Sequence, residues 1–467
     1  MDRSIFAVRT LKSVFEASRR RVATGSLGAG SLIARVTALP TLAITFCFVL
    51  FFLLMVNVDI VRNEGATAAG SGSPLGGDFI AFFNAGRIVA DGDGSDLYDW
   101  ERQVAGQARA LGVATVDTVM PFPYPAFVAA PYALLARMPY VWAYVLATLA
   151  MFAAAIAAVL LLRPVSPTVR AQPLLVTLGV LASQPLLQVM YGGQTVAFSL
   201  LCFAGSYAAL RRERDVAAGV WLGLLLYKPQ LAVPLLALLL WRGRWRVVAV
   251  AGAVGIALGS VGLAIAGPDW PRQMLALVGS TGYTAQERLN GPQMISLMGV
   301  AEQIFGAKSL WAYAVAGVLG LGALALLLRV WRHAKPERAT FSLQFGLAIV
   351  VTLLVSPHAL YYEAGLLVLP AIALIDHWRF ADTETGGERP TPFQRLTLVV
   401  LFLVGHVRFF VPAGAVDLFA VFPIVLGVLL WQALVSGDDA TATAPERWAL
   451  TRSARQAPPG LVVPDRP

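Results

Sequence analysis

Long apolar stretches separated by short polar or basic segments make up most of this chain. Folded as an α-helix, each stretch is long enough to cross a hydrocarbon layer of about 30 Å. A helix satisfies its backbone hydrogen bonds internally, and the short alternating segments typical of a membrane β-barrel do not recur along this sequence. The pattern therefore predicts an all-α polytopic membrane protein.

The apolar runs also predict where the membrane is crossed. Residues 216–241 are apolar, but Lys228-Pro229 interrupts them and arginines flank both ends, so two half-helices folded at this dipeptide fit better than one span. With this pair counted as two, we expect about twelve transmembrane helices, in a range of 10 to 13. The other predicted spans are 39–60, 139–162, 172–190, 195–210, 247–266, 309–331, 340–356, 361–375, 396–413 and 415–435.

Charge predicts the orientation of these spans. Residues 1–37 hold seven Lys/Arg against two acids, whereas 62–121 hold eight acids against four arginines. Basic segments stay inside, so we expect both termini in the cytoplasm and 62–121 outside. Residues 122–138 are too rich in proline for a span and are interpreted as an interfacial return, with their aromatic side chains at headgroup depth. The predicted domains are a cytoplasmic basic segment 1–37, a transmembrane domain 38–435 with outer loops 62–138 and 268–308, and a polar cytoplasmic tail 436–467.

Composition supports this class of protein and excludes others. The 467 residues are 57% hydrophobic and 13% charged, with a mean hydropathy of +0.69. The net charge of +9 comes from clusters between spans without a nucleic-acid motif, so we expect no nucleic-acid partner. Cys47 and Cys202 lie in apolar stretches and are interpreted as small buried hydrophobes. No phosphate-binding glycine loop or metal ligand set is apparent, so no cofactor and no metal are predicted.

Asp78 is the first candidate for chemistry. It follows Gly76 and Gly77 and precedes Phe79 in the long polar interval after the first span. One hypothesis makes its carboxylate a general base that takes a proton from an acceptor hydroxyl. The other makes it the N-cap of a helix that starts at Phe79, and the residue by itself favours the cap.

The acidic run from Asp91 to Asp99 follows in the same loop. Its closely spaced oxygen ligands are similar to those of a calcium loop, but the glutamate expected at the twelfth position is missing. A solvated turn is therefore the favoured interpretation.

Polar groups within or between spans are the remaining candidates. Lys228, His406 and Arg408 are ionisable residues in apolar surroundings, which usually face a cavity or a partner, with snorkelling as the alternative. Tyr191-Gly-Gly-Gln194 is either a tight turn or a turn that presents its amide to a ligand. Ser356-Pro-His358 ends a predicted span, and Tyr361, Tyr362 and Glu363 follow it; interfacial anchoring is the alternative for these residues.

In order along the chain, these residues resemble glycosyltransferase family 87, which includes polyprenol-phosphate-mannose-dependent mannosyltransferases. Two departures are visible: Tyr124-Pro125-Ala126 stands where the family has Tyr-Pro-Pro, and 268–308 shows no family signature. The motifs that carry the resemblance are Asp78-Phe79, Leu97-Tyr98-Asp99, Phe122-Pro-Tyr-Pro125, Gly193-Gln194, Ala218-Gly219 with Gly223, Lys228-Pro229 and Ser356-Pro-His358.

The resemblance implies a GT-C-type fold in a bacterial inner membrane, with the active site on the periplasmic side. It implies an inverting transfer of a sugar, mannose or another hexose or pentose, from a polyprenyl-phosphate donor to a lipid or glycan acceptor. Asp78 matches the family's base, and His358 matches its histidine near the donor. We expect His358, Lys228 and Arg408 to bind the donor phosphate, with Tyr124, Gln194, Tyr362, Glu363 and His406 lining the substrate cavity.

A transporter of lipids or solutes is the alternative from another class of protein. Buried cations also mark transport pathways, so Lys228, His406 and Arg408 do not distinguish the two functions by themselves. A transporter would work without the Asp78 carboxylate, whereas a transferase would not.

Overall fold

The computed structural model describes residues 74–116, 118–381, 390–407 and 418–441. The predicted span 39–60 and Arg408 lie outside these residues. Within the described ranges the chain is helical, with one isolated antiparallel bridge between Met294 and Leu360. The α-helices are α3 (Phe79–Ala90), α4 (Trp100–Leu111), α5 (Ala129–Leu135), α6 (Tyr140–Leu162), α7 (Pro167–Ala171), α8 (Pro173–Leu181), α9 (Gln184–Tyr191), α10 (Val196–Leu210), α11 (Asp215–Leu224), α12 (Pro229–Trp241), α13 (Trp245–Ala266), α14 (Trp270–Val278), α15 (Thr281–Asn290), α16 (Leu297–Phe305), α17 (Leu310–Trp331), α18 (Phe341–Val355), α19 (Val368–Ala381), α20 (Pro392–Val407) and α21 (Val421–Thr441). The 3₁₀ helices are η1 (Gly94–Asp96), η2 (Ala126–Val128), η3 (Leu225–Tyr227), η4 (Gly291–Gln293), η5 (Tyr361–Leu367) and η7 (Leu418–Ala420).

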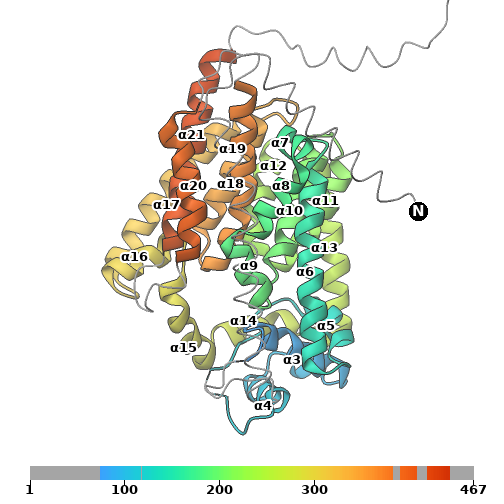
Figure 1. The fold of residues 1–467 in the computed structure, drawn as a ribbon. Helices are drawn as coiled ribbons and strands as arrows, with labels where there is room; N and C mark the ends of the chain where they lie inside the picture. The colour runs from blue at the N-terminus through green and yellow to red at the C-terminus, as the bar shows by residue number, and fades with distance from the viewer. Residues whose placement is uncertain (1–73, 117, 382–389, 408–417, 442–467) are drawn as a thin grey trace, which may run out of the picture.

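The long helices form one bundle (Figure 1). Helix α10 packs against α6 and α11, α11 packs against α13, and α18 packs against both α19 and α21. Helices α3, α4, α14 and α15 gather at the lower end of the bundle in Figure 1, which we call the α3–α4 end. The short helices of the α3–α4 end cover the ends of the long helices, and the candidate site lies among them.

Three of the described helices are long and apolar enough to cross a membrane, judged by length and composition: α6, α13 and α17. They correspond to the predicted spans 139–162, 247–266 and 309–331. Other predicted spans appear as shorter apolar helices, among them α10, α18 and α21. The total of twelve spans and the orientation of the bundle stay predictions.

Two predicted spans are broken where the sequence analysis expected continuous helices. The stretch 172–190 divides into α8 and α9, because Pro185 has no N–H to continue the helical ladder. The carbonyl of Ala182 at this break lies 2.9 Å from Nε2 of His406. The stretch 361–375 begins as the 3₁₀ helix η5 and becomes α-helical only at α19. Irregular backbone of this kind in a membrane protein needs protein or a cavity beside it.

The interruption predicted at Lys228-Pro229 is confirmed. Helix α11 and η3 lead to Lys228, whose φ of −125° and ψ of 79° are not helical, and α12 begins at Pro229. The two outer ends of this pair meet, since Asp215 at the start of α11 accepts a hydrogen bond of 3.0 Å from Arg244 just before α13. The chain therefore folds back at Lys228 and returns both flanking arginine clusters to one end of the bundle.

Residues 122–138 include η2 and α5; α5 packs against α3, and η2 packs against α13. Their aromatic side chains face the protein: Phe122 is 1% exposed, and the Tyr132 ring stacks on Phe82 with centroids 4.9 Å apart. Both rings pack against Phe82 of α3, and the expectation that these aromatics lie at headgroup depth stays a prediction.

Candidate active site

Asp78 immediately precedes α3 but does not cap it. Its backbone is already helical, with φ of −66° and ψ of −10°, and its side chain makes no capping hydrogen bond. Instead, the carboxylate oxygen Oδ2 accepts a hydrogen bond from Nε2 of Gln194. The capping interpretation is therefore wrong, and the carboxylate is directed toward residues that come from elsewhere in the chain.

Two glycine pairs make this contact possible. Gly76, Gly77 and Gly193 all have positive φ, at 77°, 52° and 65°. A Cβ on Gly193 would collide with the Phe79 backbone and Cβ, and the Asp78 N–H donates to the Gly192 carbonyl at 3.1 Å. Only glycine adopts such backbone conformations at little cost and permits so close an approach. The Tyr191-Gly-Gly-Gln194 segment is thus a turn whose packing holds the Gln194 amide against Asp78.

Lys228 forms a buried ion pair with Glu363. Their side chains meet at 2.6 Å between Nζ and Oε1, and the two residues are 3% and 4% exposed. The pair joins the break between η3 and α12 to the 3₁₀ helix η5. The ammonium also lies 6.0, 5.9 and 5.6 Å from the ring centroids of Tyr124, Tyr227 and Tyr362. These distances are within the range of cation–π attraction.

Helix α4 positions Tyr124 through the extended segment that precedes η2. Gln107 pairs with both backbone groups of Met120, at 2.6 and 3.0 Å, and Gln103 Oε1 accepts from the Phe122 N–H at 3.0 Å. The Tyr98 hydroxyl donates to the Tyr124 carbonyl at 2.8 Å. The hydroxyl of Tyr124 then lies 3.5 Å from Oε1 of Gln194. The Leu97-Tyr98-Asp99 motif therefore acts on the site indirectly, by fixing Tyr124.

The charges of the site act on one another. Burial raises the pKa of Asp78, while the Gln194 hydrogen bond and the electrostatic effects of Lys228 and His358 lower it. Burial also raises the pKa of Tyr124, and the nearby carboxylates of Glu363 and Asp78 raise it further. Tyr124 thus stays protonated and available as a hydrogen-bond donor. Asp78, Lys228 and His358 share one electrostatic environment although they are far apart in sequence.

The loop that carries His358 is held by the second predicted outer loop, 268–308. The Ile295 N–H donates to the Ala359 carbonyl at 2.8 Å, beside the bridge between Met294 and Leu360. The Ser356 hydroxyl accepts from the His358 N–H at 3.4 Å. This loop is therefore fixed from both sides of the histidine.

The predicted site residues fall into three groups. Asp78, Gln194, Tyr124, Lys228, Glu363, Tyr362 and His358 come together. His406 lies apart from this group, with its ring nitrogens 3.0 and 2.9 Å from the carbonyls of Phe402 in α20 and of Ala182 at the α8–α9 break. Arg408 lies outside the described residues. The sequence analysis missed Tyr227, whose ring centroid lies 5.9 Å from the Lys228 ammonium.

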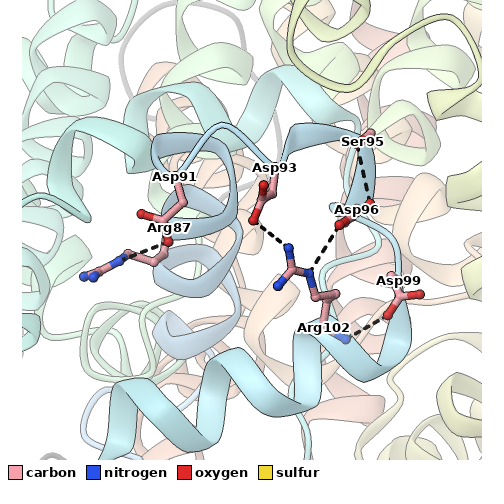
Figure 2. Close-up of polar contacts among 7 residues, drawn as sticks. All are labelled: Arg87, Asp91, Asp93, Ser95, Asp96, Asp99 and Arg102. Atoms are coloured by element: carbon pink, nitrogen blue, oxygen red, sulfur yellow. Dashed lines mark hydrogen bonds and ion pairs between the residues drawn. The ribbon is translucent and has the colours of Figure 1, made fainter.

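Aspartates in the run from Asp91 to Asp99 form ion pairs and hydrogen bonds with arginines (Figure 2). Arg102 of α4 contacts Asp93 at 2.5 Å and Asp96 at 3.3 Å, and its backbone N–H donates to Asp99 at 2.8 Å. These carboxylates thus already have partners within the protein, which supports the turn over a calcium loop. A cavity of about 270 Å³ beside these residues is lined by arginines of α3 and α4, and Asp78 is not among its lining residues.

A half-buried carboxylate near a buried lysine at one end of an apolar helical bundle defines a membrane protein with a polar site. The family model of glycosyltransferase family 87 matches residues 122–357, half of the chain. The chain belongs to this family and is therefore a membrane glycosyltransferase. The matched residues include Tyr124, Gln194 and Lys228, whereas Asp78 and Glu363 lie beyond them. No curated protein and no solved structure matches the chain.

Proposed function

We propose that this protein transfers a sugar from a polyprenyl-phosphate donor to a lipid or glycan acceptor at the periplasmic face of a bacterial inner membrane. The observation that carries the proposal is the Asp78 carboxylate, which does not cap α3 and instead lies against Gln194 in the electrostatic range of two cationic or potentially cationic residues. Family membership supports sugar transfer over the alternative of transport.

Asp78 acts as the general base in this proposal. Because Gln194 occupies Oδ2, the acceptor hydroxyl is assigned to Oδ1. The acceptor oxygen forms a bond to the anomeric carbon as its proton moves to Asp78, and the bond from that carbon to the phosphate oxygen breaks. The phosphate leaves with the electron pair on the opposite face of the sugar, so the configuration inverts.

Cationic side chains stabilise the departing phosphate. Lys228 and His358 both lower the pKa of Asp78, which supports their assignment to the phosphate of the donor. Charge-assisted hydrogen bonds to phosphate oxygens are stronger than neutral ones, and they strengthen further as the leaving group gains charge. Arg408 completes the proposed set on grounds of sequence, since it lies outside the described residues.

The test replaces Asp78 by asparagine, which preserves shape and the hydrogen bond to Gln194. We expect transfer of sugar to fall by about 10² to 10⁴, the range typical of a lost general base, with donor affinity nearly unchanged. Transfer is measured with a polyprenyl-phosphate sugar and a membrane extract as the source of acceptor, and the anomeric configuration of the product reports inversion.

Asp91→Asn is the matched control. This carboxylate pairs with Arg87 one helical turn earlier at 3.5 Å on the surface, so its loss should leave transfer within about twofold. Full turnover by Asp78→Asn, or an equal loss in both variants, would remove Asp78 from the role of base.

A further inference from the structure

Glu363 has one carboxylate oxygen that the protein does not use. Oε1 is bonded to Lys228, but Oε2 is buried and accepts no hydrogen bond from any described residue. Leaving a buried acceptor unsatisfied is expensive compared with leaving it in water. An ionised carboxylate can only accept, so the missing partner is a donor such as a hydroxyl group.

The surroundings of this oxygen match the chemistry of a sugar. The rings of Tyr124, Tyr227 and Tyr362 surround the Lys228 ammonium, which lies 2.6 Å from Oε1 of Glu363. A sugar offers hydroxyl donors at its edge for a carboxylate and an apolar C–H face for an aromatic ring. Flat aromatic surface and a carboxylate therefore occur together where a hexose or pentose would need both.

Charge makes the same position unsuitable for the phosphate itself. The Glu363 carboxylate already balances the charge of Lys228 at 2.6 Å, and a phosphate placed against Oε2 would meet a like charge in a buried setting. The phosphate must therefore approach Lys228 from the side away from Glu363. The donor would therefore lie with its sugar beside Glu363 and its phosphate on the far side of Lys228.

We propose that Glu363 binds a hydroxyl group of the donor sugar through Oε2, with Lys228 bridging between this carboxylate and the donor phosphate. The inference rests on the proposed function, and it adds a sugar-binding residue to the site. Glu363 thereby makes the protein distinguish a polyprenyl phosphate that carries a sugar from one that does not.

The experiment compares two ligands on purified protein: a polyprenyl-phosphate hexose and the same polyprenyl phosphate without sugar. In Glu363→Gln, affinity for the sugar-bearing lipid should fall on the order of 10- to 100-fold, the size of a lost hydrogen bond to a charged group. Affinity for the sugarless lipid should hold or rise, because a negative charge near Lys228 has been removed. Retained binding of the sugarless lipid also shows that the variant is folded.

A double variant covers the case in which the single one does not fold. Lys228→Met with Glu363→Met replaces the ion pair by apolar side chains of similar size, an exchange that buried pairs often tolerate. It should bind both lipids weakly and with equal affinity. Asp376→Asn is the matched control, since this buried carboxylate accepts from the Thr168 N–H at 2.8 Å and belongs to α19, which packs on α7 away from the α3–α4 end.

The outcomes separate this inference from the proposed function. A preference for the sugar-bearing lipid that survives in Glu363→Gln or in the double variant overturns the role of Glu363, even if Asp78 is confirmed as base. An equal loss of both lipids in a stable Glu363→Gln protein does the same. Wild-type protein that binds neither lipid overturns the proposed function, and this inference with it.

Discussion

At the scale of single residues, the proposed role of Asp78 as a general base places two opposing demands on its carboxylate. A general base must be ionised to accept a proton, but burial disfavours the ionised form and raises the pKa of Asp78. The hydrogen bond from the Gln194 amide and the electrostatic effects of Lys228 and His358 lower the pKa of Asp78 and so oppose the effect of burial. A carboxylate held in this way is a stronger base than one in water, because its proton affinity is higher.

The same opposition predicts how Asp78→Asn affects stability. When the folded-state pKa lies above the unfolded one, the folded protein prefers the protonated form, and this contribution to stability is lost as pH rises through the folded pKa. Near neutral pH the ionised carboxylate therefore destabilises the fold. We expect the asparagine variant to unfold at the same temperature as wild type or higher, measured by thermal unfolding in detergent. A decrease in Tm would instead indicate a structural role, such as the cap that usually contributes about 1 kcal/mol.

Gln194 should set the pH dependence of transfer. Its hydrogen bond favours the ionised form of Asp78, so Gln194→Leu should raise the pKa of Asp78 further. The acidic limb of the pH profile of kcat/KM, which in wild type should lie above the ordinary aspartate pKa of about 4, should then move to higher pH.

The control for this profile is Gln432→Leu, which removes an exposed amide of α21 that is bonded to Gln394 at 3.2 Å. It should leave the profile in place. An acidic limb that stays fixed in Gln194→Leu would mean that the titrating group is not Asp78.

At the scale of elements, the site depends on how closely the turn before α10 approaches the start of α3. Gly193 has a φ of 65° and lies against the Phe79 backbone. Gly112 after α4 has a similar φ of 70°, but a Cβ there would meet nothing within 4 Å. Comparing alanine substitutions at the two glycines therefore separates the effect of a strained backbone, common to both, from the effect of a collision, which occurs only at Gly193.

We expect Gly193→Ala to be damaged more than Gly112→Ala. Both should lose about 1 kcal/mol of stability because alanine is strained at positive φ. Only Gly193→Ala should also displace Gln194 from Asp78 and lower transfer by about tenfold or more, since small displacements of catalytic groups have large effects on rate. Thermal unfolding and transfer rates of the two variants check this. Equal losses in both would mean that the approach to Phe79 does not control the site.

Sequence patterns predicted the elements whose cause is local and missed those whose cause is tertiary. The break at Lys228-Pro229 was predictable, because proline and the flanking charges both indicate it. The break between α8 and α9 was not predictable. The Ala182 carbonyl at this break lies against the ring of His406, which belongs to a helix far along the chain. In the same way, whether the Asp78 side chain caps α3 could not be decided from its neighbours in sequence, and only its contact with Gln194 decides against the cap.

Tyr227 and the burial of the Phe122 and Tyr132 side chains show the same limit at the site. A tyrosine beside a lysine carries no sequence signal that distinguishes a ring packed against an ammonium from one facing lipid. The Lys228–Glu363 pair joins residues that are 135 positions apart in the chain, and no local spacing predicts that contact. The order of the motifs indicated the family, and only the packing of the helices shows which side chains contact one another at the site.

At the scale of the whole molecule, the site lies toward one end of the bundle and the basic clusters lie at the other. Asp78 begins α3 at the α3–α4 end in Figure 1, whereas Arg211 donates to the carbonyls of Pro336 and Arg338 at 2.6 and 2.5 Å at the far ends of α10 and α18. Basic clusters of this kind favour the cytoplasmic side. A donor whose sugar faces the periplasm would then meet Asp78 from the membrane without crossing the bundle.

This arrangement predicts which end of the protein is accessible from outside the cell. Single cysteines are placed at Ala114, which is exposed after α4, and at Glu337, which is exposed between α17 and α18, in a protein whose Cys47 and Cys202 are replaced by serine and alanine. In cells whose outer membrane is permeabilised and whose inner membrane is intact, an impermeant thiol reagent should label Ala114→Cys. Glu337→Cys should stay unlabelled until the inner membrane is also permeabilised. Labelling of both sites after opening controls for reactivity. The reverse pattern would put Asp78 on the cytoplasmic side, where a donor presented from the periplasm could not reach it. That result would contradict a periplasmic site. It would leave the proposed chemistry of Asp78 to be tested by Asp78→Asn.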